Sequence, residues 1–96
     1  MLSTQSIVVA SSDQVSVDMD GEMVMLSMKD GVYYGLNPMG TCIWKLIQQP
    51  QAVSQVIDAL LAEYEVDRTR CEKEVFALLH DLESHGLIEI RNMPHA

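Results

Sequence analysis

Histidine and cysteine are the side chains of this 96-residue chain that could act as a base or a nucleophile. They are Cys42, Cys71, His80, His85 and His95. Cys71 and His85 are fourteen positions apart on one predicted helix, a separation of about 21 Å at 1.5 Å per residue. A nucleophile and its base must lie within hydrogen-bonding reach, so these two residues do not form a pair. Apolar residues surround Cys42, and we expect both cysteines to act as small buried hydrophobes.

Acidic residues are the other groups that could take part in catalysis. The pairs Glu72/Glu74 and Asp81/Glu83 are each two positions apart, and residues at that spacing point in different directions on a helix. The sequence also contains no glycine-rich phosphate loop and no zinc-ligand spacing. We therefore predict that the protein is not an enzyme and has no catalytic residue, no metal and no cofactor.

The charge and hydropathy of the chain exclude further classes. The net charge is −8 with six Lys and Arg residues, whereas phosphate recognition requires clustered cations. Arg68, Arg70 and Lys73 do cluster, but acidic residues surround and follow them. No signal segment is visible, and no apolar run approaches the roughly 18 residues of a membrane span. We expect residues 1–96 to form a single cytoplasmic domain that binds neither nucleic acid nor membrane.

Two Asp-Gly pairs, at 20–21 and 30–31, separate three segments of strand character. Asp-Gly between alternating segments is a strong hairpin signal, because Gly adopts positive φ without strain. The predicted result is an antiparallel meander of Val15–Met19, Glu22–Met28 and Val32–Leu36. Both faces of the middle strand are largely apolar, so each face must be covered or part of one must be reserved for a partner.

The hydrophobic period becomes helical after Asn37 and Pro38, which suit an N-cap and a first helical position. The predicted helices are Pro38–Gln48, Ala52–Tyr64 and Arg68–His85. Gly86 ends the third helix, and a short closing strand at Leu87–Ile90 and a tail at 91–96 follow. The predicted fold class is α+β: a three-stranded antiparallel sheet followed by a three-helix bundle, winged helix-turn-helix-like in its helix lengths.

The last strand of the meander has an edge to which another chain could add. Natural proteins blunt such edges with Lys, Pro or a bulge, but Gly31–Leu36 is uncharged and places glycine on both sides of its aromatic residues. An edge of this kind is a template for β-augmentation by a peptide. The alternative is that Ile7–Ala10, as an initial strand or ordered arm, covers the edge. The sequence leaves both readings open.

A resemblance to a known family rests on two segments, GVYYGLNPMGTCIWKLI from residue 31 and VSQVIDALLAEYEVDRTRCEKEVFALLHDLESHGLI from residue 53. They resemble the PqqD-like recognition elements of ribosomally synthesised, modified peptides (RiPPs), and most closely the discrete leader-binding proteins of lasso-peptide biosynthesis. The resemblance implies an adaptor that captures the leader of a precursor peptide as an added strand and presents it to a leader peptidase and a macrocyclase. The alternatives are a PqqD-type peptide chaperone for a radical SAM enzyme and, further from the sequence, a winged-helix transcription regulator.

The resemblance also implies where the leader would bind: along the last strand of the meander and in a groove against the third helix. The implied strand residues are Gly31, Val32, Tyr33, Tyr34, Gly35 and Leu36. The implied helix residues are Glu72, Val75, Phe76, Leu79 and Glu83, with Cys71, Leu78 and Leu82 left to hold the core. The two glutamates either attract basic leader residues or simply form a solvated face of the helix, and the sequence favours the solvated face. Which of the two tyrosines faces the groove depends on the strand register.

Overall fold

The structure is a computed structural model and describes residues 2–12 and 14–91. Its elements in chain order are β1 (Ile7–Ala10), β2 (Gln14–Met19), β3 (Glu22–Ser27), β4 (Tyr33–Gly35), α1 (Pro38–Leu46), β5 (Gln51–Ala52), α2 (Val53–Glu63), α3 (Arg68–Ser84) and β6 (Ile88–Arg91). The predicted mixture of an antiparallel three-stranded sheet and three helices is confirmed. Of the predicted tail, Arg91 belongs to β6 and residues 92–96 lie outside the described residues.

The meander forms as the Asp-Gly pairs predict. Asp20 and Gly21 both have positive φ, at 56° and 88°, and together make the two-residue loop between β2 and β3. Gly31, with φ of 70°, closes the longer turn between β3 and β4. The strands pair in the order β2-β3-β4, and β4 is the shortest of the three.

A second three-stranded sheet, in the order β5-β1-β6, was not predicted. The segment Ile7–Ala10 is its central strand and pairs with Ala52 on one side and with Arg91 on the other. The predicted closing strand is present, one residue later than expected, as β6. Because Ile7–Ala10 pairs in this sheet, it does not cover the edge of β4, and that alternative is wrong.

Helix α1 begins at the predicted cap, and a side chain also caps the start of α3. The Asn37 side chain accepts a hydrogen bond from the Gly40 N–H at 2.8 Å, and Pro38 follows as the first residue of α1. The Asp67 side chain accepts from the Arg70 N–H at the start of α3. Strand β4 therefore passes into α1 through only Leu36 and Asn37, which holds the end of the strand against the helices.

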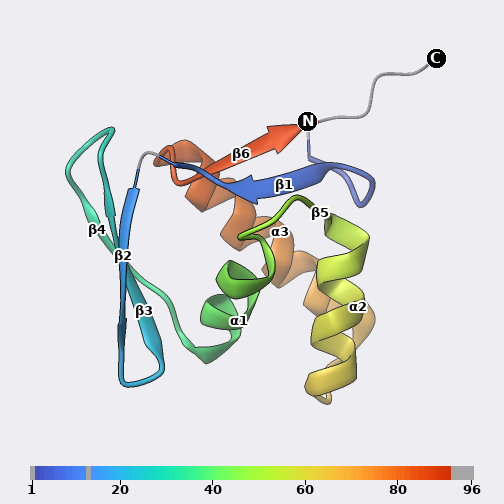
Figure 1. The fold of residues 1–96 in the computed structure, drawn as a ribbon. Coiled ribbons are helices and arrows are strands. Elements are labelled where there is room, and N and C mark those ends of the chain that lie inside the picture. Colours follow the sequence, from blue (N-terminus) through green and yellow to red (C-terminus); the bar gives the residue numbers. More distant parts are fainter. Residues whose placement is uncertain (1, 13, 92–96) are drawn as a thin grey trace.

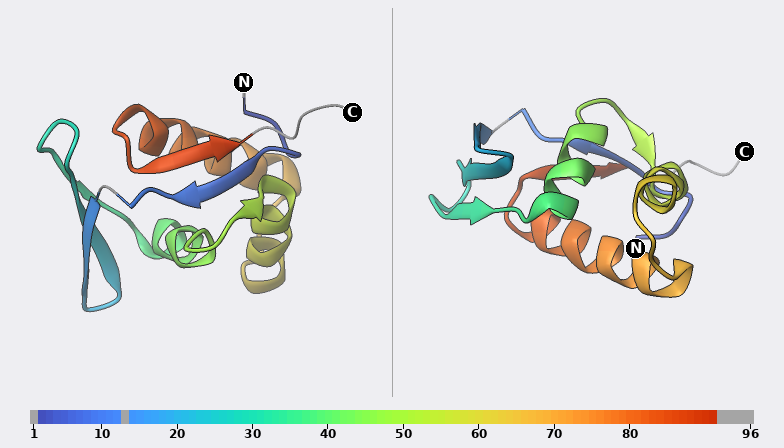
Figure 2. Two further views of the ribbon diagram at one scale, coloured as in Figure 1. Left: turned by 45° about the horizontal axis from the view of Figure 1, so that its top comes forward. Right: turned by 90° about the horizontal axis from the view of Figure 1, so that it is seen from below.

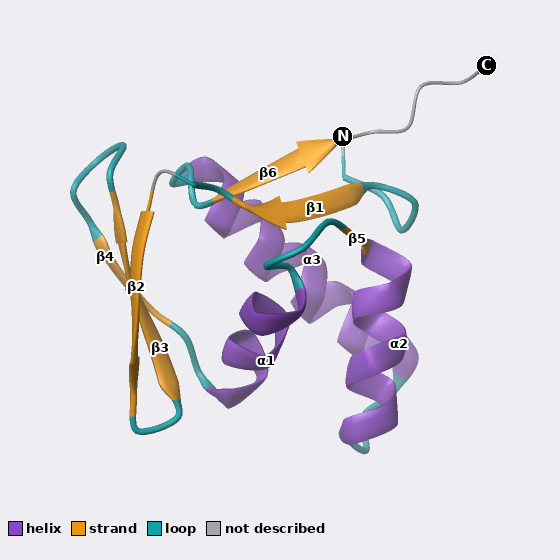
Figure 3. Cartoon of the chain, in the orientation of Figure 1, coloured by secondary structure: helices purple, strands orange, loops and turns teal. Residues whose placement is uncertain are grey.

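The helices cover one face of the meander and leave the other face outward. Figures 1 and 2 show α1, α2 and α3 on the same side of the β2-β3-β4 sheet, and Figure 3, coloured by type of element, shows strands β1, β5 and β6 on that side as well. The core between them includes Trp44, which is 1% exposed, together with Met25 and Leu36 from the inner face of the sheet. The core thus fixes β4 from one side only.

Candidate peptide-binding edge and groove

The backbone of β4 directs alternate residues toward and away from β3. The Ser27 N–H donates to the Val32 carbonyl at 3.0 Å, and the Leu36 N–H donates to the Met23 carbonyl at 2.8 Å. In an antiparallel pair the hydrogen-bonded residues alternate, so the N–H and C=O groups of Tyr33 and Gly35 point away from β3. Within residues 2–12 and 14–91, no strand pairs with this edge.

The side chains of the two tyrosines lie on opposite faces of β4. Tyr33 is 74% exposed on the outer face. Tyr34 lies on the inner face, where its hydroxyl donates to Asp81 at 3.4 Å and its ring centroid is 5.5 Å from that of His85. Burial, reinforced by the negative charge of Asp81, raises the pKa of the Tyr34 hydroxyl above its usual value. The register thus places Tyr34, and not Tyr33, beside α3.

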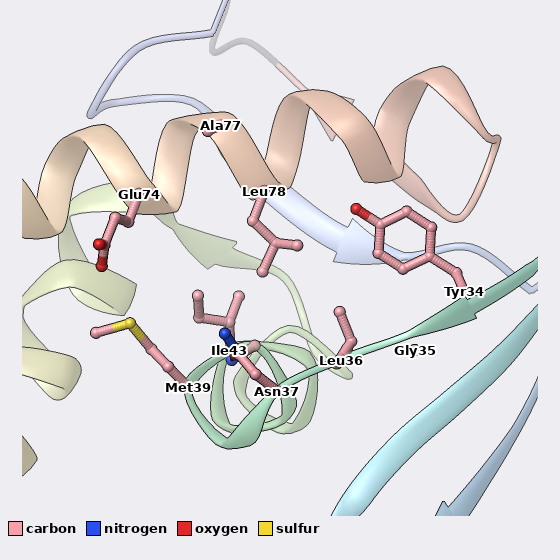
Figure 4. A pocket seen from close by; sticks show the side chains of 10 residues that line it. Tyr34, Gly35, Leu36, Asn37, Met39, Ile43, Glu74, Ala77 and Leu78 are labelled. Atoms are coloured by element: carbon pink, nitrogen blue, oxygen red, sulfur yellow. The ribbon is translucent and has the colours of Figure 1, made fainter.

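A groove of about 350 Å³ lies between β4, α1 and α3. Its lining residues are Tyr34, Gly35, Leu36, Asn37, Met39, Gly40, Ile43, Glu74, Ala77 and Leu78. Figure 4 shows Leu78 pointing from α3 toward Ile43, on α1, with Tyr34 at one end of the groove and Glu74 at the other. The groove therefore offers an apolar floor beside the outward backbone groups of β4.

Comparisons with known proteins decide the family. The family model for coenzyme PQQ synthesis protein D (PqqD) matches residues 22–88, which is more than half of the chain. The chain belongs to the PqqD family. The assignment to PqqD-like RiPP recognition elements is thereby confirmed.

Two solved structures are similar to this PqqD-family chain over most of its length. TbiB1 in complex with the TbiA(beta) leader peptide is 34% identical with a TM-score of 0.77, and the match covers 84% of this chain and 94% of that one. Lasso peptide synthetase B1 complexed with the leader peptide is 27% identical with a TM-score of 0.74, covering 85% and 96%. Among curated protein sequences, none matched this chain.

The division of α3 between core and groove differs from the prediction. Val75 and Leu79, which were expected to line the groove, are both 0% exposed and belong to the core. Leu78, which was expected in the core, lines the groove instead, while Cys71 and Leu82 are buried as expected. The reason is that the apolar stripe along α3 of this PqqD-family chain is wide. An error of one residue in the direction assumed to face the core therefore exchanges the residues assigned to the core with those assigned to the groove.

The remaining predicted residues do not line the groove. Phe76 is half-buried and packs against the core, Glu72 is half-buried, and Glu83 is exposed. Gly31 and Val32 are exposed in the turn before β4. Tyr33 faces outward, as described above. Of the eleven predicted residues, the groove is lined by Tyr34, Gly35 and Leu36.

Sequence reasoning missed the lining residues from α1 and three from α3. Met39, Gly40 and Ile43 follow directly from the short junction at Asn37, which turns the start of α1 back beside β4. A Cβ on Gly40 would lie 3.2 Å from the Leu36 side chain, so a larger residue would crowd the groove. On α3, Glu74 and Leu78 are four positions apart and share a face, a spacing that could have identified them.

The turn before β4 is attached to the end of α3. His85 Nδ1 lies 2.9 Å from the Asp30 carboxylate, and the Ser27 hydroxyl donates to the His85 carbonyl at 2.5 Å. The hydrogen bond with His85 is the main cause of a lowered pKa at Asp30. His85 lies beside both Asp30 and Tyr34, so it joins the turn and the edge strand to the end of α3.

The cysteines are not activated in this fold. Burial is the main cause of a raised pKa at both thiols, which favours the unreactive protonated form. Cys71 is fully buried, and the Cys42 thiol donates to Glu63 at 3.3 Å. Among residues 2–12 and 14–91, no group of three His, Cys, Asp or Glu side chains could hold a metal ion. In the same residues, no helix combines the length and apolar character needed to cross a membrane.

Proposed function

We propose that this chain is a leader-binding adaptor of lasso-peptide biosynthesis. It captures the leader region of a ribosomally made precursor peptide as an added strand on β4, and presents the precursor to a leader peptidase and a macrocyclase. The observation that carries the proposal is the edge of β4, which no strand of residues 2–12 and 14–91 pairs with, directly beside an apolar groove. The similarity to two structures that hold leader peptides supports it.

The edge would supply affinity that does not depend on the leader's side chains. The N–H and C=O groups of Tyr33 and Gly35 are directed outward, and each hydrogen bond to them would contribute about 0.5–1.5 kcal/mol net. A strand added there would turn every second side chain toward α3. Hydrogen bonds from the backbone would thus give affinity, and the side chains facing the groove would give specificity.

The groove would select apolar anchors followed by basic residues. Leu36, Ile43 and Leu78 form the floor, which suits an aliphatic or aromatic leader side chain. Glu74 at one end is 3.4 Å from Arg70, and Asp81 is bonded to Tyr34 at the other. Arg70 offsets the charge of Glu74, so the Tyr34 end, beside Asp81, is the acidic one, and a basic leader residue would be attracted there. Phe76, Glu72 and Glu83 lie outside this lining, and their contact with the leader stays a prediction.

A second candidate is supported by the family match itself. The family model is that of a coenzyme PQQ synthesis protein, so the same edge could serve as a peptide chaperone for a radical SAM enzyme. The winged helix-turn-helix likeness of the helices, and the DNA-binding regulator that it suggests, stay predictions that the net charge of −8 does not favour.

The decisive experiment is a titration of the purified chain with the leader segment of the precursor encoded beside it. We expect saturable binding, and its absence at tens of micromolar would overturn the proposal. Two further leader peptides carry N-methyl groups at alternate backbone positions, one at the odd positions and the other at the even positions. Only one of these two sets of N–H groups would face β4, so one peptide should bind and the other should not. Adding the peptidase or the radical enzyme of the same operon then separates the two candidates.

A further inference from the structure

Strand β4 has a glycine at a position where its outer face would otherwise carry a side chain. Figure 4 shows the Tyr34 and Leu36 side chains on the α3 side of β4, with Gly35 between them. Successive residues of a strand point to opposite faces, so the missing side chain of Gly35 belongs to the face turned away from the helices, which we call the outer face. Tyr33, two positions earlier, is 74% exposed on that face. The glycine therefore leaves a gap in the outward row of side chains along the edge strand.

This gap is not filled by another part of the chain. Gly35 pairs with Val24 of β3, and a Cβ built on Gly35 would meet no atom beyond its chain neighbours within 4 Å among the residues that the structure describes. A hollow of about 290 Å³ lies at this point and is lined by Glu22, Met23, Val24, Gly35, Leu36 and Asn37. Val24 is half-buried and lies on the outer face, because Met25 after it is fully buried on the inner face. The hollow therefore has room for a side chain and an apolar wall for it to pack on.

The conformation of the backbone does not explain the glycine. Gly21 and Gly31 have positive φ in their turns, at 88° and 70°, but the φ of Gly35 lies outside the left-handed region. Within a strand, glycine loses conformational entropy on folding and offers no side chain to pack, and it often marks a place where a ligand or another backbone approaches closely. What distinguishes Gly35 is the open space above it.

A strand added to β4 would place one of its residues opposite Gly35. Because the N–H and C=O groups of Gly35 point away from β3, the two residues would form a hydrogen-bonded pair, with Cα atoms about 5.5 Å apart in an antiparallel arrangement. The side chain of that leader residue would stand on the outer face and not in the groove. Val24 lies about 4.5 Å further across the sheet. The leader residue would thus face Val24 over about 10 Å, with no side chain between them.

A span of this length selects a long, flat side chain. A small side chain opposite Gly35 would leave the hollow empty, whereas an aromatic ring laid across the glycine reaches the next strand. Aromatic residues packed over a glycine of the neighbouring strand compensate for its missing side chain in sheets. The position opposite Tyr33 differs, because the Tyr33 ring itself separates a leader side chain from Leu26, its partner on β3.

We propose that the hollow at Gly35 is a second specificity site, which takes one aromatic side chain from the outward row of the bound leader and packs it against Val24. The proposal rests on the proposed leader-binding function and extends it. The groove between β4 and α3 selects leader side chains of one row, and the hollow at Gly35 selects a side chain of the other row.

The test measures the coupling between Gly35 and the leader side chain opposite it. The full chain is titrated with the leader of the precursor encoded beside it, and with peptides in which each aromatic residue is replaced by Ala in turn. Gly35→Val fills the hollow with a residue that strands favour, and it should weaken binding of the unmodified leader about tenfold. For one of the substituted peptides, which itself binds the wild type about tenfold more weakly, Gly35→Val should change the affinity by less than about twofold. Gly35→Ala adds one methyl group and should stay within about threefold of the wild type.

A second pair of variants leaves β4 unchanged. Val24→Ala and Leu26→Ala both shorten an aliphatic side chain on the outer face of β3, but Val24 is paired with Gly35 and Leu26 with Tyr33. Val24→Ala should weaken binding of the unmodified leader about fivefold, and Leu26→Ala, the matched control, should stay within about twofold. Urea unfolding of each variant confirms that the titrated protein is folded.

The outcomes separate this proposal from leader binding itself. If the wild type binds the leader and Gly35→Val binds it equally tightly, or if the leader that binds has no aromatic residue, the second site is wrong and leader binding stands. If Gly35→Val weakens every peptide to the same extent, the valine disturbs the added strand as a whole, and the aromatic site is again wrong. Equal losses for Val24→Ala and Leu26→Ala would contradict the packing on Val24. If the wild type binds no leader, both proposals fail.

Discussion

The two three-stranded sheets of this domain differ in where their unpaired edges lie. In β5-β1-β6 the central strand is paired on both sides, and its residue Val8 is fully buried. In β2-β3-β4 the last strand is short, its outward edge has no partner strand among the described residues, and its outer residue Tyr33 is 74% exposed. The first sheet closes the N- and C-terminal segments of the domain onto its core. The second presents backbone groups and an apolar face.

The difference shows that an open edge here is not a consequence of a short chain. The segment Ile7–Ala10 is apolar and could have covered β4, yet it pairs with β5 and β6. Open edges carry a risk of aggregation, so leaving this one free is informative. Asp30 and His85 attach the turn of the open sheet to α3, which holds the edge in place without covering it.

The contrast between a closed and an open region also runs along α3, where Leu79 lies in the core and Leu78 lines the groove. Substitutions at these two positions should give the largest effect. Leu79→Ala should lower the free energy of unfolding by about 2–5 kcal/mol, because it leaves a cavity. Leader affinity of the folded fraction should change little. Leu78→Ala should do the reverse, with a smaller loss of stability and clearly weaker binding. Urea unfolding and leader titration measure the two, and equal effects on binding would contradict the division.

A milder pair of substitutions compares the sheets directly. Val8→Thr places a hydroxyl in the core of the closed sheet and should cost about 1–3 kcal/mol of stability. Val17→Thr makes the same change on the outer face and should stay within about 0.5 kcal/mol. Urea unfolding of both variants gives the comparison. A large loss for Val17→Thr would mean that the exposed side of β2 is covered within the chain.

The open edge itself is tested at Gly35, whose N–H points away from β3. A Cβ at this position meets no atom within 4 Å, and its φ lies outside the left-handed region. Gly35→Pro removes the outward donor and should weaken leader binding roughly tenfold, about the value of one lost hydrogen bond plus crowding by the ring. Gly35→Ala keeps the donor and is the matched control. Equal affinity for Pro and Ala variants would show that the leader does not add at this edge.

Local signals in the sequence predicted the meander and the helices, but not the pairing of strands that are far apart in the sequence. Asp20-Gly21 and Asn37-Pro38 act within a few residues, so their turn and cap could be recognised. The β5-β1-β6 sheet joins segments from both ends of the chain through a two-residue strand, β5, that has no pattern to detect. The sides of α3 were misassigned for a related reason. Periodicity defines a stripe, but only the packed neighbours decide which edge of the stripe is buried.

The smallest expected effect concerns how the open sheet is anchored. The bond to His85 lowers the pKa of Asp30 in the folded state, so the ionised form contributes stability above the unfolded-state value of about 3.9. That contribution is lost as the pH falls through the folded-state pKa. Asp30→Asn should therefore be slightly less stable than the wild type at pH 6, and the difference should be smaller at pH 3, below the unfolded-state pKa. Urea unfolding at both pH values measures it, with Asp20→Asn, in the other turn of the same sheet, as the control. A difference that persists or grows in acid would mean that the Asp30–His85 bond does not anchor the edge strand, and that the Ser27–His85 bond and the pairing with β3 hold it instead.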